Sequence, residues 1–371
     1  MTLSRVEEDL LRDPDNVETY LVYADLLQSR GDPRGELIAM DHRLLTHGPS
    51  PELQRARDAL FARHREAWLG DLSEHGPCVE LSWRLGFIKS ARIALDWDHY
   101  DAGVEPDQLL ARLLAHPSAR FLQELRLGMV NFEGENFYDG MIDVLVGAGP
   151  HPTLRRLHIG DYDFPDETEI SWTEVGDAGS LWPHCEGLRE VILQGGGISL
   201  GEIDLPELRS FEVRTGGLDR AAIRSICSAR WPELRRLVLW FGDESYGAEG
   251  TTDDIRPVLD GTGLPSLRHL GLMNADFTDA ICAALPAARI LPRLLTLDLS
   301  MGVMTDEGAR RLSEHREAFL HLQRLDLSDN YLEHAGVQLV QGLCGRVETG
   351  RQKTPYVSAD GKVQRYPSVG E

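Results

Sequence analysis

The sequence predicts an α/β solenoid, in which short parallel strands form an inner sheet and helices cover its outer side. The stretch LQRLDLSDNYL, residues 322–332, has leucines at 322, 325, 327 and 332 and an asparagine at 330. This spacing fits neither a helix face nor the strict alternation of an ordinary half-buried strand. It predicts a very short strand at Leu325–Leu327, followed by a turn in which the Asn330 amide satisfies backbone groups.

Weaker copies of this pattern occur upstream, as a repeat architecture requires, because each repeat gains its core only from its neighbours. Successive copies from residue 88 onward are separated by 34, 32, 34, 20, 26, 33, 27 and 28 residues, so only the last two spacings are regular. The strand positions of the copies, in chain order, are Ile88/Ala91/Ile93, Leu122/Leu125/Leu127, Leu154/Leu157/Ile159, Leu188/Val191/Leu193, Leu208/Phe211/Val213, Leu234/Leu237/Leu239, Leu267/Leu270/Leu272, Leu294/Leu297/Leu299 and Leu322/Leu325/Leu327.

The segments between the predicted strands favour helices. In TDEGARRLSEHREAF, Thr305 is the expected N-cap, and Asp306 and Glu307 place negative charge in the first turn. FTDAICAALPAARIL, LDRAAIRSICSARW and EHAGVQLVQGLCGR occupy equivalent places. A strand, a loop and a helix in repeats near 28 residues resemble the ribonuclease-inhibitor type of leucine-rich repeat, over residues 88–346. The resemblance implies a leucine-rich-repeat solenoid, shaped as a horseshoe with a parallel inner sheet and outer helices.

Residues 1–76 predict a different element, a helical module that covers the first repeat of a solenoid spanning residues 77–346. Asp15 and Glu18 suggest a capping box, Gly31 ends that helix, and Asp32-Pro33 and Ser50-Pro51 begin the next ones. The stretch LLRDPDNVETYLVYADLLQSRGDPRGELIAM, with WRLGFIKSARI after it, resembles the bacterial repeat-companion domain. This resemblance implies the same architecture and a bacterial source, and no catalytic activity.

Residues 347–371 predict a C-terminal β-hairpin, because Asp360-Gly361 joins two short extended runs in TPYVSADGKVQRYPSVGE. We expect this hairpin to cap the last repeat. A docking tail is the alternative, since residues 346–371 carry five basic and three acidic side chains in an acidic protein.

The composition limits the classes of partner. A net charge of −22 argues against non-specific binding to nucleic acid and to anionic membranes, and is compatible with a basic protein partner; solubility alone also explains it. The chain has no apolar run of about 18 residues or more, and its start, MTLSRVEEDLLRDPDN, lacks the features of a signal peptide. We therefore expect a cytoplasmic protein. Five cysteines without a C-x-x-C pair argue against a disulfide framework or a zinc site.

No motif predicts an active site, a cofactor or a metal. The triple glycine of LQGGGISLG lacks the G-K-[ST] ending of a phosphate loop, and turn glycines at the end of a strand are the simpler interpretation. His184 and Cys185 are adjacent in WPHCEG, but neighbouring side chains usually diverge. H-E-x-x-H and G-x-S-x-G are both absent. The sequence therefore predicts a protein that is not an enzyme.

Two acidic loops follow predicted strands and should lie at one edge of the sheet. They are GDYDFPDETE, with Asp161 and Asp163, and FGDESYGAEGTTDD, with Asp243 and Glu244. Enlarged loops of repeat proteins often lie on the binding side, although solvated charged loops are the alternative. The calcium-loop spacing is absent.

The inner face supplies further candidates. The residue between the last two apolar positions of each strand should point away from the core, which gives a column that runs from basic to acidic: Arg92, Arg126, His158, Ile192, Glu212, Val238, Gly271, Asp298 and Asp326. Trp240 and Met273 should form an apolar patch beside Phe241, with Arg214 and Arg236 close by. The alternative is that Trp240 packs under the loop 242–254.

These patterns predict a non-catalytic scaffold that binds a partner protein through its concave face and strand-exit loops. The alternative is a regulator or inhibitor of a partner enzyme, neutralising a toxin or activating a GTPase, as the repeat type implies only by resemblance. A concealed hydrolase ranks third. The predicted contact residues are Arg126, His158, Asp161, Asp163, Arg214, Arg236, Trp240, Phe241, Asp243, Glu244, Met273, Asp298 and Asp326.

Overall fold

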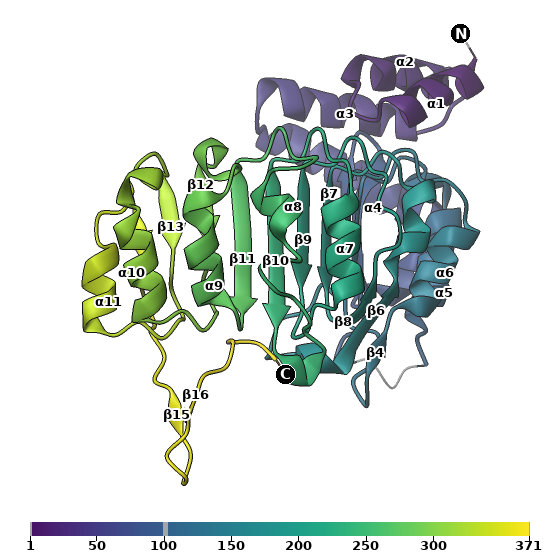
Figure 1. Cartoon of the computed structure of the whole chain (residues 1–371). Coiled ribbons are helices and arrows are strands. Elements are labelled where there is room, and N and C mark those ends of the chain that lie inside the picture. Colours follow the sequence, from purple (N-terminus) through teal and green to yellow (C-terminus); the bar gives the residue numbers. More distant parts are fainter. Residues whose placement is uncertain (1, 99–102, 371) are drawn as a thin grey trace. The chain divides into compact units, whose positions relative to one another are not determined.

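The computed structural model describes residues 2–98 and 103–370, and the chain divides into two compact units (Figure 1). The first unit comprises Met1–Glu133, Gly140–Asp161 and Pro183–Gly187. The second unit comprises Gly134–Asp139, Tyr162–Trp182 and Leu188–Glu371. The sequence predicted boundaries after residues 76 and 346, whereas the boundary between these two units lies within the repeats.

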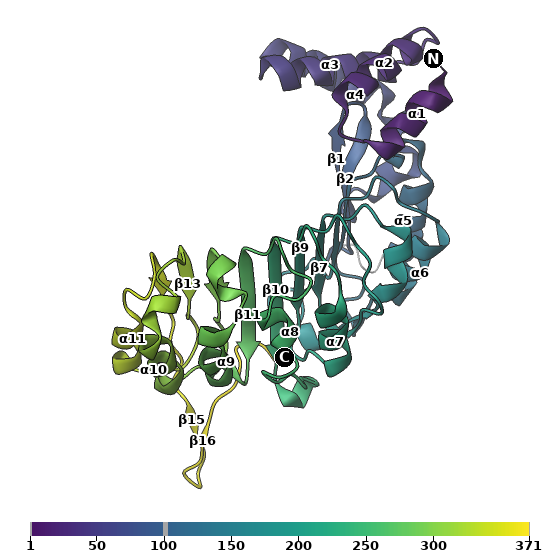
Figure 2. The same ribbon diagram turned by 45° about the horizontal axis from the view of Figure 1, so that its top comes forward.

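The first unit begins with four helices, α1 (Leu3–Arg12), α2 (Val17–Gln28), α3 (Arg34–His47) and α4 (Pro51–Leu69) (Figure 2). Ser50 caps α4, with Pro51 in its first turn, as expected. The cap of α2 differs by one residue: the Asn16 side chain, rather than Asp15, accepts a hydrogen bond from the Thr19 amide.

The helices of the first unit pack against its first strands. Strand β1 (Val79–Arg84) pairs antiparallel with β2 (Phe87–Ile93) through a tight turn at Leu85 and Gly86, both of which have positive φ. Tyr23 of α2 stacks on Phe87, with ring centroids 5.7 Å apart. The buried Arg34 of α3 donates to the Gly86 carbonyl at 2.7 Å. The helical module thus covers the first strand pair.

The remaining strands of the first unit are parallel. β2 pairs with β3 (Glu124–Leu127), and β3 pairs with β5 (Arg156–Ile159). Helices α5 (Pro106–Ala115) and α6 (Asp139–Gly147) lie between these strands in the chain. The sequence placed the first strand at residue 88 and missed β1, since β1 lacks the spacing of the repeats.

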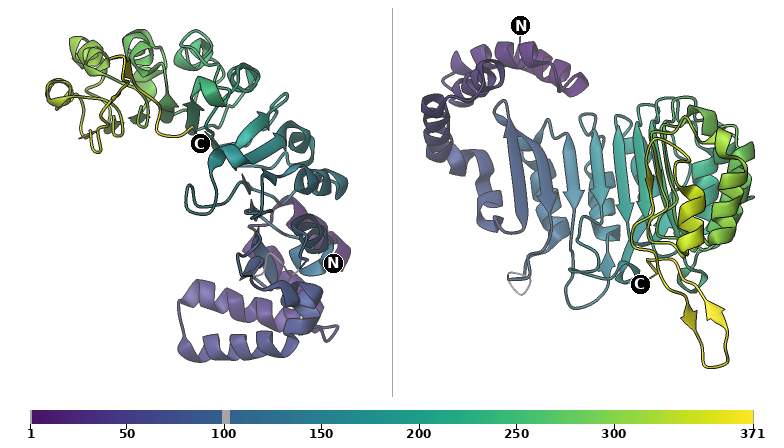
Figure 3. Two further views of the ribbon diagram at one scale, coloured as in Figure 1. Left: turned by 90° about the horizontal axis from the view of Figure 1, so that it is seen from below. Right: turned by 90° about the vertical axis from the view of Figure 1, so that its left-hand side faces the viewer.

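The second unit holds the regular repeats. Its sheet runs in the order β7, β9, β10, β11, β12, β13, β14, and all neighbouring strands are parallel. The helices lie on one side of this sheet, as Figures 1 and 3 show. The strands are β7 (Glu190–Gln194), β9 (Ser210–Arg214), β10 (Arg236–Gly242), β11 (His269–Ala275), β12 (Thr296–Asp298), β13 (Arg324–Asp326) and β14 (Val347–Glu348), and the helices are α7 (Arg220–Ser228), α8 (Arg256–Leu259), α9 (Thr278–Ala284), α10 (Asp306–Glu314) and α11 (His334–Val340).

The leucines of the repeat pattern form the core of this unit. Leu237, Leu270, Leu297 and Leu325 are register partners on successive strands, and each is at most 1% exposed. The predicted N-cap Thr305 accepts from the Glu307 amide at the start of α10. Helix α9 covers only the first half of the segment expected to be helical, because Pro286 interrupts it and a 3₁₀ turn follows.

Asn330 performs the role that the sequence predicted for it. Its side chain is fully buried, and its Oδ1 accepts from the Met304 amide at 2.9 Å. Its Nδ2 donates to the carbonyls of Leu299, Leu327 and Ser328 at 2.9, 3.2 and 3.1 Å. One amide therefore joins the turns of two adjacent repeats, and its neighbour Asp329 takes the positive φ (54°) that the turn requires.

Carboxylates link the outer helices. Asp279 of α9 accepts from the Thr305 amide and hydroxyl and from the Gly308 amide. In the next repeat, Asp306 accepts from the Glu333 amide. A Cβ on Gly308 would lie 2.4 Å from Asp279 Oδ1, and one on Gly336 would lie 2.0 Å from Asp306 Oδ1, so only glycine fits at these approaches.

A second sheet was not expected. Strands β4 (Asn136–Phe137), β6 (Thr173–Asp177) and β8 (Gly196–Ser199) form three parallel strands in the second unit. The triple glycine therefore extends into a strand instead of ending in a turn. Gly195 has φ 142°, and a Cβ there would lie 2.9 Å from the Thr173 side chain, so glycine permits β7 to lead directly into β8.

The C-terminal hairpin forms but does not cap the last repeat. β15 (Tyr356–Val357) pairs with β16 (Val363–Gln364), and all four residues are exposed. The last repeat strand β13 is instead covered by β14. Residues 365–370, which we call the tail, then return to the ends of the strands (Figure 1).

No helix among the described residues is long and apolar enough to cross a membrane. The five cysteines are free, and Cys344 lies after α11 and not inside a helix as expected.

We expect Asn330→Ala to lower the free energy of unfolding by about 2–4 kcal/mol, because it leaves buried carbonyls and one amide without partners. Urea unfolding measures this change. The exposed Gln323 on the same repeat provides the control, and Gln323→Ala should change stability by less than about 0.5 kcal/mol. Equal stability of the two variants would contradict the role assigned to Asn330.

Candidate functional site

The inner-face column predicted from sequence is a row of register partners within each unit. In the first unit, Arg92 pairs with Arg126, and Arg126 pairs with His158. In the second unit the successive partners are Ile192, Glu212, Val238, Gly271, Asp298 and Asp326. Because these residues alternate with buried leucines, they lie on the face of the sheet opposite the helices.

The Asp161 carboxylate contacts three basic side chains of the first unit. It accepts from Arg92 Nε at 2.8 Å, lies 3.3 Å from Arg126 Nη1, and its other oxygen lies 3.2 Å from His158 Nδ1. Burial alone would raise the pKa of Asp161, but the His158 hydrogen bond and charge, together with the two arginines, hold that pKa well below its usual range. The basic half of the column is therefore largely neutralised inside the chain.

Glu212 plays the same part in the second unit. Arg214 Nε and Arg236 Nη2 lie 2.7 and 2.9 Å from its two carboxylate oxygens, and Glu212 is only 7% exposed. Burial would raise the pKa of Glu212, but the two arginines lower it further than burial raises it. Arg214 also donates to Gln194 Oε1. The two arginines are thus close together, as predicted, and Glu212 fixes their orientation.

The carboxylates at the acidic end of the column accept hydrogen bonds from backbone amides of the turns that follow their strands. Asp298 accepts from the Ser300 amide and Asp326 from the Ser328 amide, both at 2.9 Å. Burial raises the pKa of Asp298, and the nearby Asp326 adds to the rise. These carboxylates are engaged by their own backbone, so the structure gives them a local role in place of a free acidic surface.

Trp240 and Met273 are register partners on β10 and β11, and both are half-buried. The space over Gly271 is occupied by its neighbours, since a Cβ there would lie 3.2 Å from the Val238 methyls and 3.5 Å from Met273 Cγ. Trp240 Nε1 is buried and has no hydrogen-bond partner among the described residues. The exposed part of the ring is therefore apolar.

Phe241 does not belong to this patch. It is fully buried and packs edge-on against Phe277, with ring centroids 5.0 Å apart. β10 extends to Gly242, so the alternation that exposes Trp240 turns Phe241 toward the core. The prediction of Phe241 as a contact residue was wrong for this reason.

The two acidic loops meet in the second unit. Phe164, Pro165 and Glu169 from one loop, and Asp243, Ser245 and Tyr246 from the other, line a cleft of about 560 Å³. The tail supplies the rest of its lining: Tyr366, Pro367, Ser368 and Gly370. Burial raises the pKa of the nearby Asp276, and the charges of Asp243 and Glu244 add to the rise. This edge of the second unit is therefore acidic and aromatic.

The predicted loop residues differ in their surroundings. Asp163 and Glu244 are exposed, whereas Asp243 is half-buried and accepts from the Ser245 amide. Asp161 belongs to the first unit, where it contacts Arg92, Arg126 and His158.

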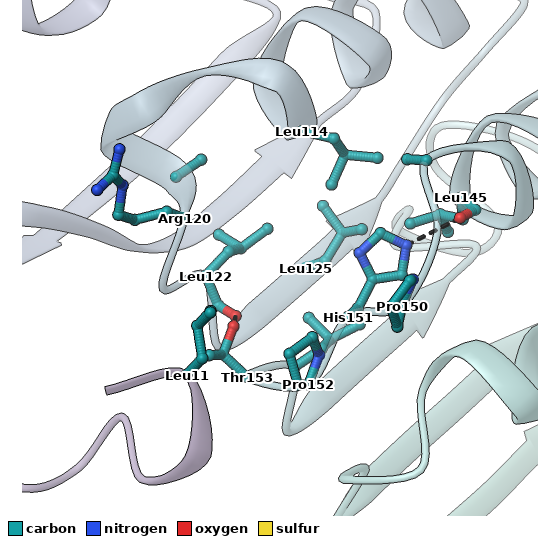
Figure 4. Close-up of a pocket in the computed structure, with 13 residues that line it drawn as sticks. Leu11, Leu114, Arg120, Leu122, Leu125, Leu145, Pro150, His151, Pro152 and Thr153 are labelled. Atoms are coloured by element: carbon teal, nitrogen blue, oxygen red, sulfur yellow. Dashed lines mark hydrogen bonds between the residues drawn. The ribbon is translucent and has the colours of Figure 1, made fainter. Parts of the chain in front are cut away.

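The first unit contains a pocket of about 150 Å³ with a mixed apolar and polar lining (Figure 4). Leu114, Leu122, Leu125 and Leu145 contribute to its lining, and His151 lies beside them with its Nε2 2.8 Å from the Leu145 carbonyl oxygen. Burial lowers the pKa of His151, so its neutral form is favoured. The pocket thus combines leucines with the polar side chains of Arg120, His151 and Thr153.

The adjacent His184 and Cys185 do not form a reactive pair. Cys185 is fully buried, and burial raises the pKa of its thiol to about 12, which disfavours the nucleophilic thiolate. The described residues contain no group of three or more His, Cys, Asp or Glu side chains that would hold a metal ion.

Two features of this edge were not predicted from sequence, the return of the tail to the strand ends and the role of Asn274. Asn274 is fully buried with φ 53°, and its side chain bonds the backbone of Val369, which is 95 residues away in the chain. No spacing rule connects such distant residues, and Asn274 occupies a position of the repeat for which the pattern prescribes no residue type.

A family model described as Leucine Rich repeat matches residues 292–313, in the most regular part of the array. A crystal structure of a protein from Bacteroides fragilis is similar, with a TM-score of 0.64 and 27% sequence identity over 81% of this chain and 84% of that chain. The fold is a leucine-rich-repeat solenoid.

This leucine-rich-repeat chain is also similar to an internalin from Listeria monocytogenes, with 11% identity over 66% of this chain and 64% of that chain. The TM-score of 0.34 is too low for that likeness to support any conclusion. No curated protein matches the chain.

We expect Asp161→Asn to lower the free energy of unfolding at pH 7 by about 1–3 kcal/mol, because it removes the charge that the two arginines share. Since the pKa of Asp161 is lower in the folded than in the unfolded chain, its stabilisation is complete above about pH 5 and declines below about pH 4. Urea unfolding between pH 7 and pH 3 should show the two chains converging as the pH falls.

The exposed Asp163 supplies the control, and Asp163→Asn should show a small difference throughout. A stability difference for Asp161→Asn that stays constant with pH would argue against the charge cluster.

Proposed function

We propose that the protein is a non-catalytic interaction module that binds a partner protein through the inner face and strand-exit loops of its second unit. The observation that carries this proposal is the half-buried pair Trp240 and Met273 on neighbouring strands, together with two arginines on β9 and β10 that Glu212 orients. A sheet face that contacts only water does not require apolar side chains of this size. Trp and Arg side chains held in place by their neighbours dominate the binding energy of many protein interfaces.

The strand ladder makes this surface favourable for binding. Trp240 and Arg236 lie on β10, which is paired on both sides with β9 and β11. Side chains on a paired central strand need little reorganisation, so less ordering entropy is lost on association.

The proposed contact set is smaller than the predicted one. It consists of Asp163, Arg214, Arg236, Trp240, Asp243, Glu244 and Met273, all in the second unit. Arg126, His158 and Asp161 are engaged with one another in the first unit, and Asp298 and Asp326 accept hydrogen bonds from their own turns. The acidic cleft and the net charge of −22 favour a partner with a basic surface at the strand-exit edge.

The resemblance of the repeats to those of ribonuclease inhibitor supports binding by the inner face, and that of residues 1–76 to the repeat-companion domain supports a covering role for the helices. A captured partner that is an enzyme, with its rate altered by the protein, would extend the proposal to regulation.

We expect Trp240→Ala to abolish or strongly weaken capture of the partner from a native lysate, while the thermal unfolding midpoint changes little. Mass spectrometry identifies the captured protein, and titration of the purified pair measures a loss of affinity of about tenfold or more. Trp172, which is 58% exposed in the same unit, provides a matched control, and Trp172→Ala should bind normally. A large loss of stability with undiminished binding would assign Trp240 to the core and contradict the proposal.

A further inference from the structure

The tail runs along the ends of the strands from β13 to β9, with a bend at Ser368. Its main chain contacts Tyr331 after β13, Met301 after β12, Asn274 at the end of β11 and Gly216 after β9. The contacts of the tail are thus spread over several repeats.

The contacts to the tail are mostly to its backbone. Tyr331 Oη donates to the Tyr366 carbonyl and accepts from the Tyr366 amide, both at 3.0 Å. The Ser368 amide donates to the Met301 carbonyl at 2.7 Å. Asn274 Nδ2 donates to the Val369 carbonyl at 2.6 Å, and its Oδ1 accepts from the Val369 amide at 2.9 Å. Backbone contacts of this kind recognise an extended peptide and leave its sequence partly open.

Side chains of the tail alternate between groove and solvent. Pro367 and Val369 are buried, whereas Tyr366 and Ser368 are exposed. The two buried side chains define two apolar positions, one on either side of the bend at Ser368. The groove therefore favours a segment of the form Pro-x-Val.

The groove is built for an occupant. Asn274 is fully buried, and both groups of its amide are directed to the tail, so an empty groove would leave a buried donor and acceptor without partners. At the far end, a Cβ on Gly216 would lie 2.1 Å from the Gly370 carbonyl oxygen, so glycine makes room for the peptide backbone. Lys353 Nζ donates to the Tyr366 carbonyl at 2.9 Å and lies over the Tyr331 ring.

The connection of the tail to the repeats is weak. The hairpin β15–β16 has two residue pairs, Tyr356–Gln364 and Val357–Val363, and its side chains are exposed. A two-stranded ribbon of this size has little stability of its own. Release of the tail therefore breaks only the contacts in the groove, and the repeats keep their cores.

We propose that the strand-exit groove of the second unit is a binding site for an extended peptide segment of a partner protein, of the form Pro-x-Val, and that the chain's own tail fills it until such a segment displaces the tail. This inference deepens the proposed function and rests on it. The tail also forms one wall of the acidic cleft, so its displacement would change the loop surface offered to the rest of the partner.

The experiment uses the full chain and a fluorescent peptide of residues 365–370, Arg-Tyr-Pro-Ser-Val-Gly, acetylated and amidated so that terminal charges play no part. Val369→Asp places a charge at a buried position and should free the groove. By fluorescence anisotropy, this variant should bind the peptide with 1:1 stoichiometry and at least tenfold more tightly than the unaltered chain, whose tethered tail competes at a high effective concentration.

Matched variants test the groove itself. Adding Tyr331→Phe to Val369→Asp removes the hydroxyl that bonds both backbone groups of Tyr366, and peptide affinity should fall about tenfold. Adding Tyr356→Phe, on the exposed hairpin, should leave affinity unchanged. A peptide with aspartate in place of its valine should fail to bind.

Three results would overturn the inference. One is a folded Val369→Asp chain that binds no peptide, which would make the tail a purely structural strap. Another is a dimer of the unaltered chain by light scattering with exchanged tails, which would assign the groove to a second copy.

The third result comes from hydrogen exchange on the unaltered chain, which decides the matter if Val369→Asp does not fold. Saturating peptide should reduce protection of the Ser368 and Val369 amides of the chain, and unchanged protection would exclude displacement. None of these assays needs the captured partner. The peptide experiments can therefore fail while Trp240→Ala still weakens capture, and Trp240→Ala can leave capture unchanged while the peptide experiments succeed.

Discussion

Every repeat of this chain depends on its neighbour to bury its strand. Leu270 is shielded by Leu237 on one side and Leu297 on the other, and none of the three would be covered within its own repeat. The regular positions must therefore match along the array, while the segments between strands are free to vary. This constraint explains why the helices between strands range from the ten residues of α5 to the four of α8 without disturbing the strand register.

Polar side chains satisfy the backbone groups that the short strands leave unpaired at their ends. Strands of three residues, such as β12 and β13, leave many backbone groups at their ends without ladder partners. Asn330 and the Asp298 and Asp326 side chains supply those partners at the turns. On the inner face, Asp161 and Glu212 hold arginines that would otherwise repel one another across adjacent strands. Hydrogen bonds to side-chain oxygens thus hold both the turns at the strand ends and the arginines on the face of the sheet.

The sequence predicted most of the fold where a short spacing rule applies. The strand positions, the Asn330 turn, the Thr305 cap and the pairing of Trp240 with Met273 follow from periodicity, which is local. It failed where contacts join distant segments. β1 and the sheet β4–β6–β8 have no repeat pattern, and Asn274 meets Val369 across 95 residues. Phe241 was placed wrongly because the length of β10, which decides the direction of its side chain, is not visible in the pattern.

The carboxylates between helices have a consequence for how long such an array can be. Asp279 accepts hydrogen bonds from the repeat that follows it, and Gly308 leaves the space for its carboxylate. Asp306, 27 positions later, accepts a hydrogen bond in the same way, and Gly336 leaves the space for its carboxylate. A block cut before Asp279 and before Asp306 carries Asp279 and Thr305 but not Gly308, so a second copy of it would place Ile281 against the Asp279 carboxylate. Adding a repeat in this region by duplication or by design therefore requires glycine at that one position of the second copy, while the remaining connections are already present.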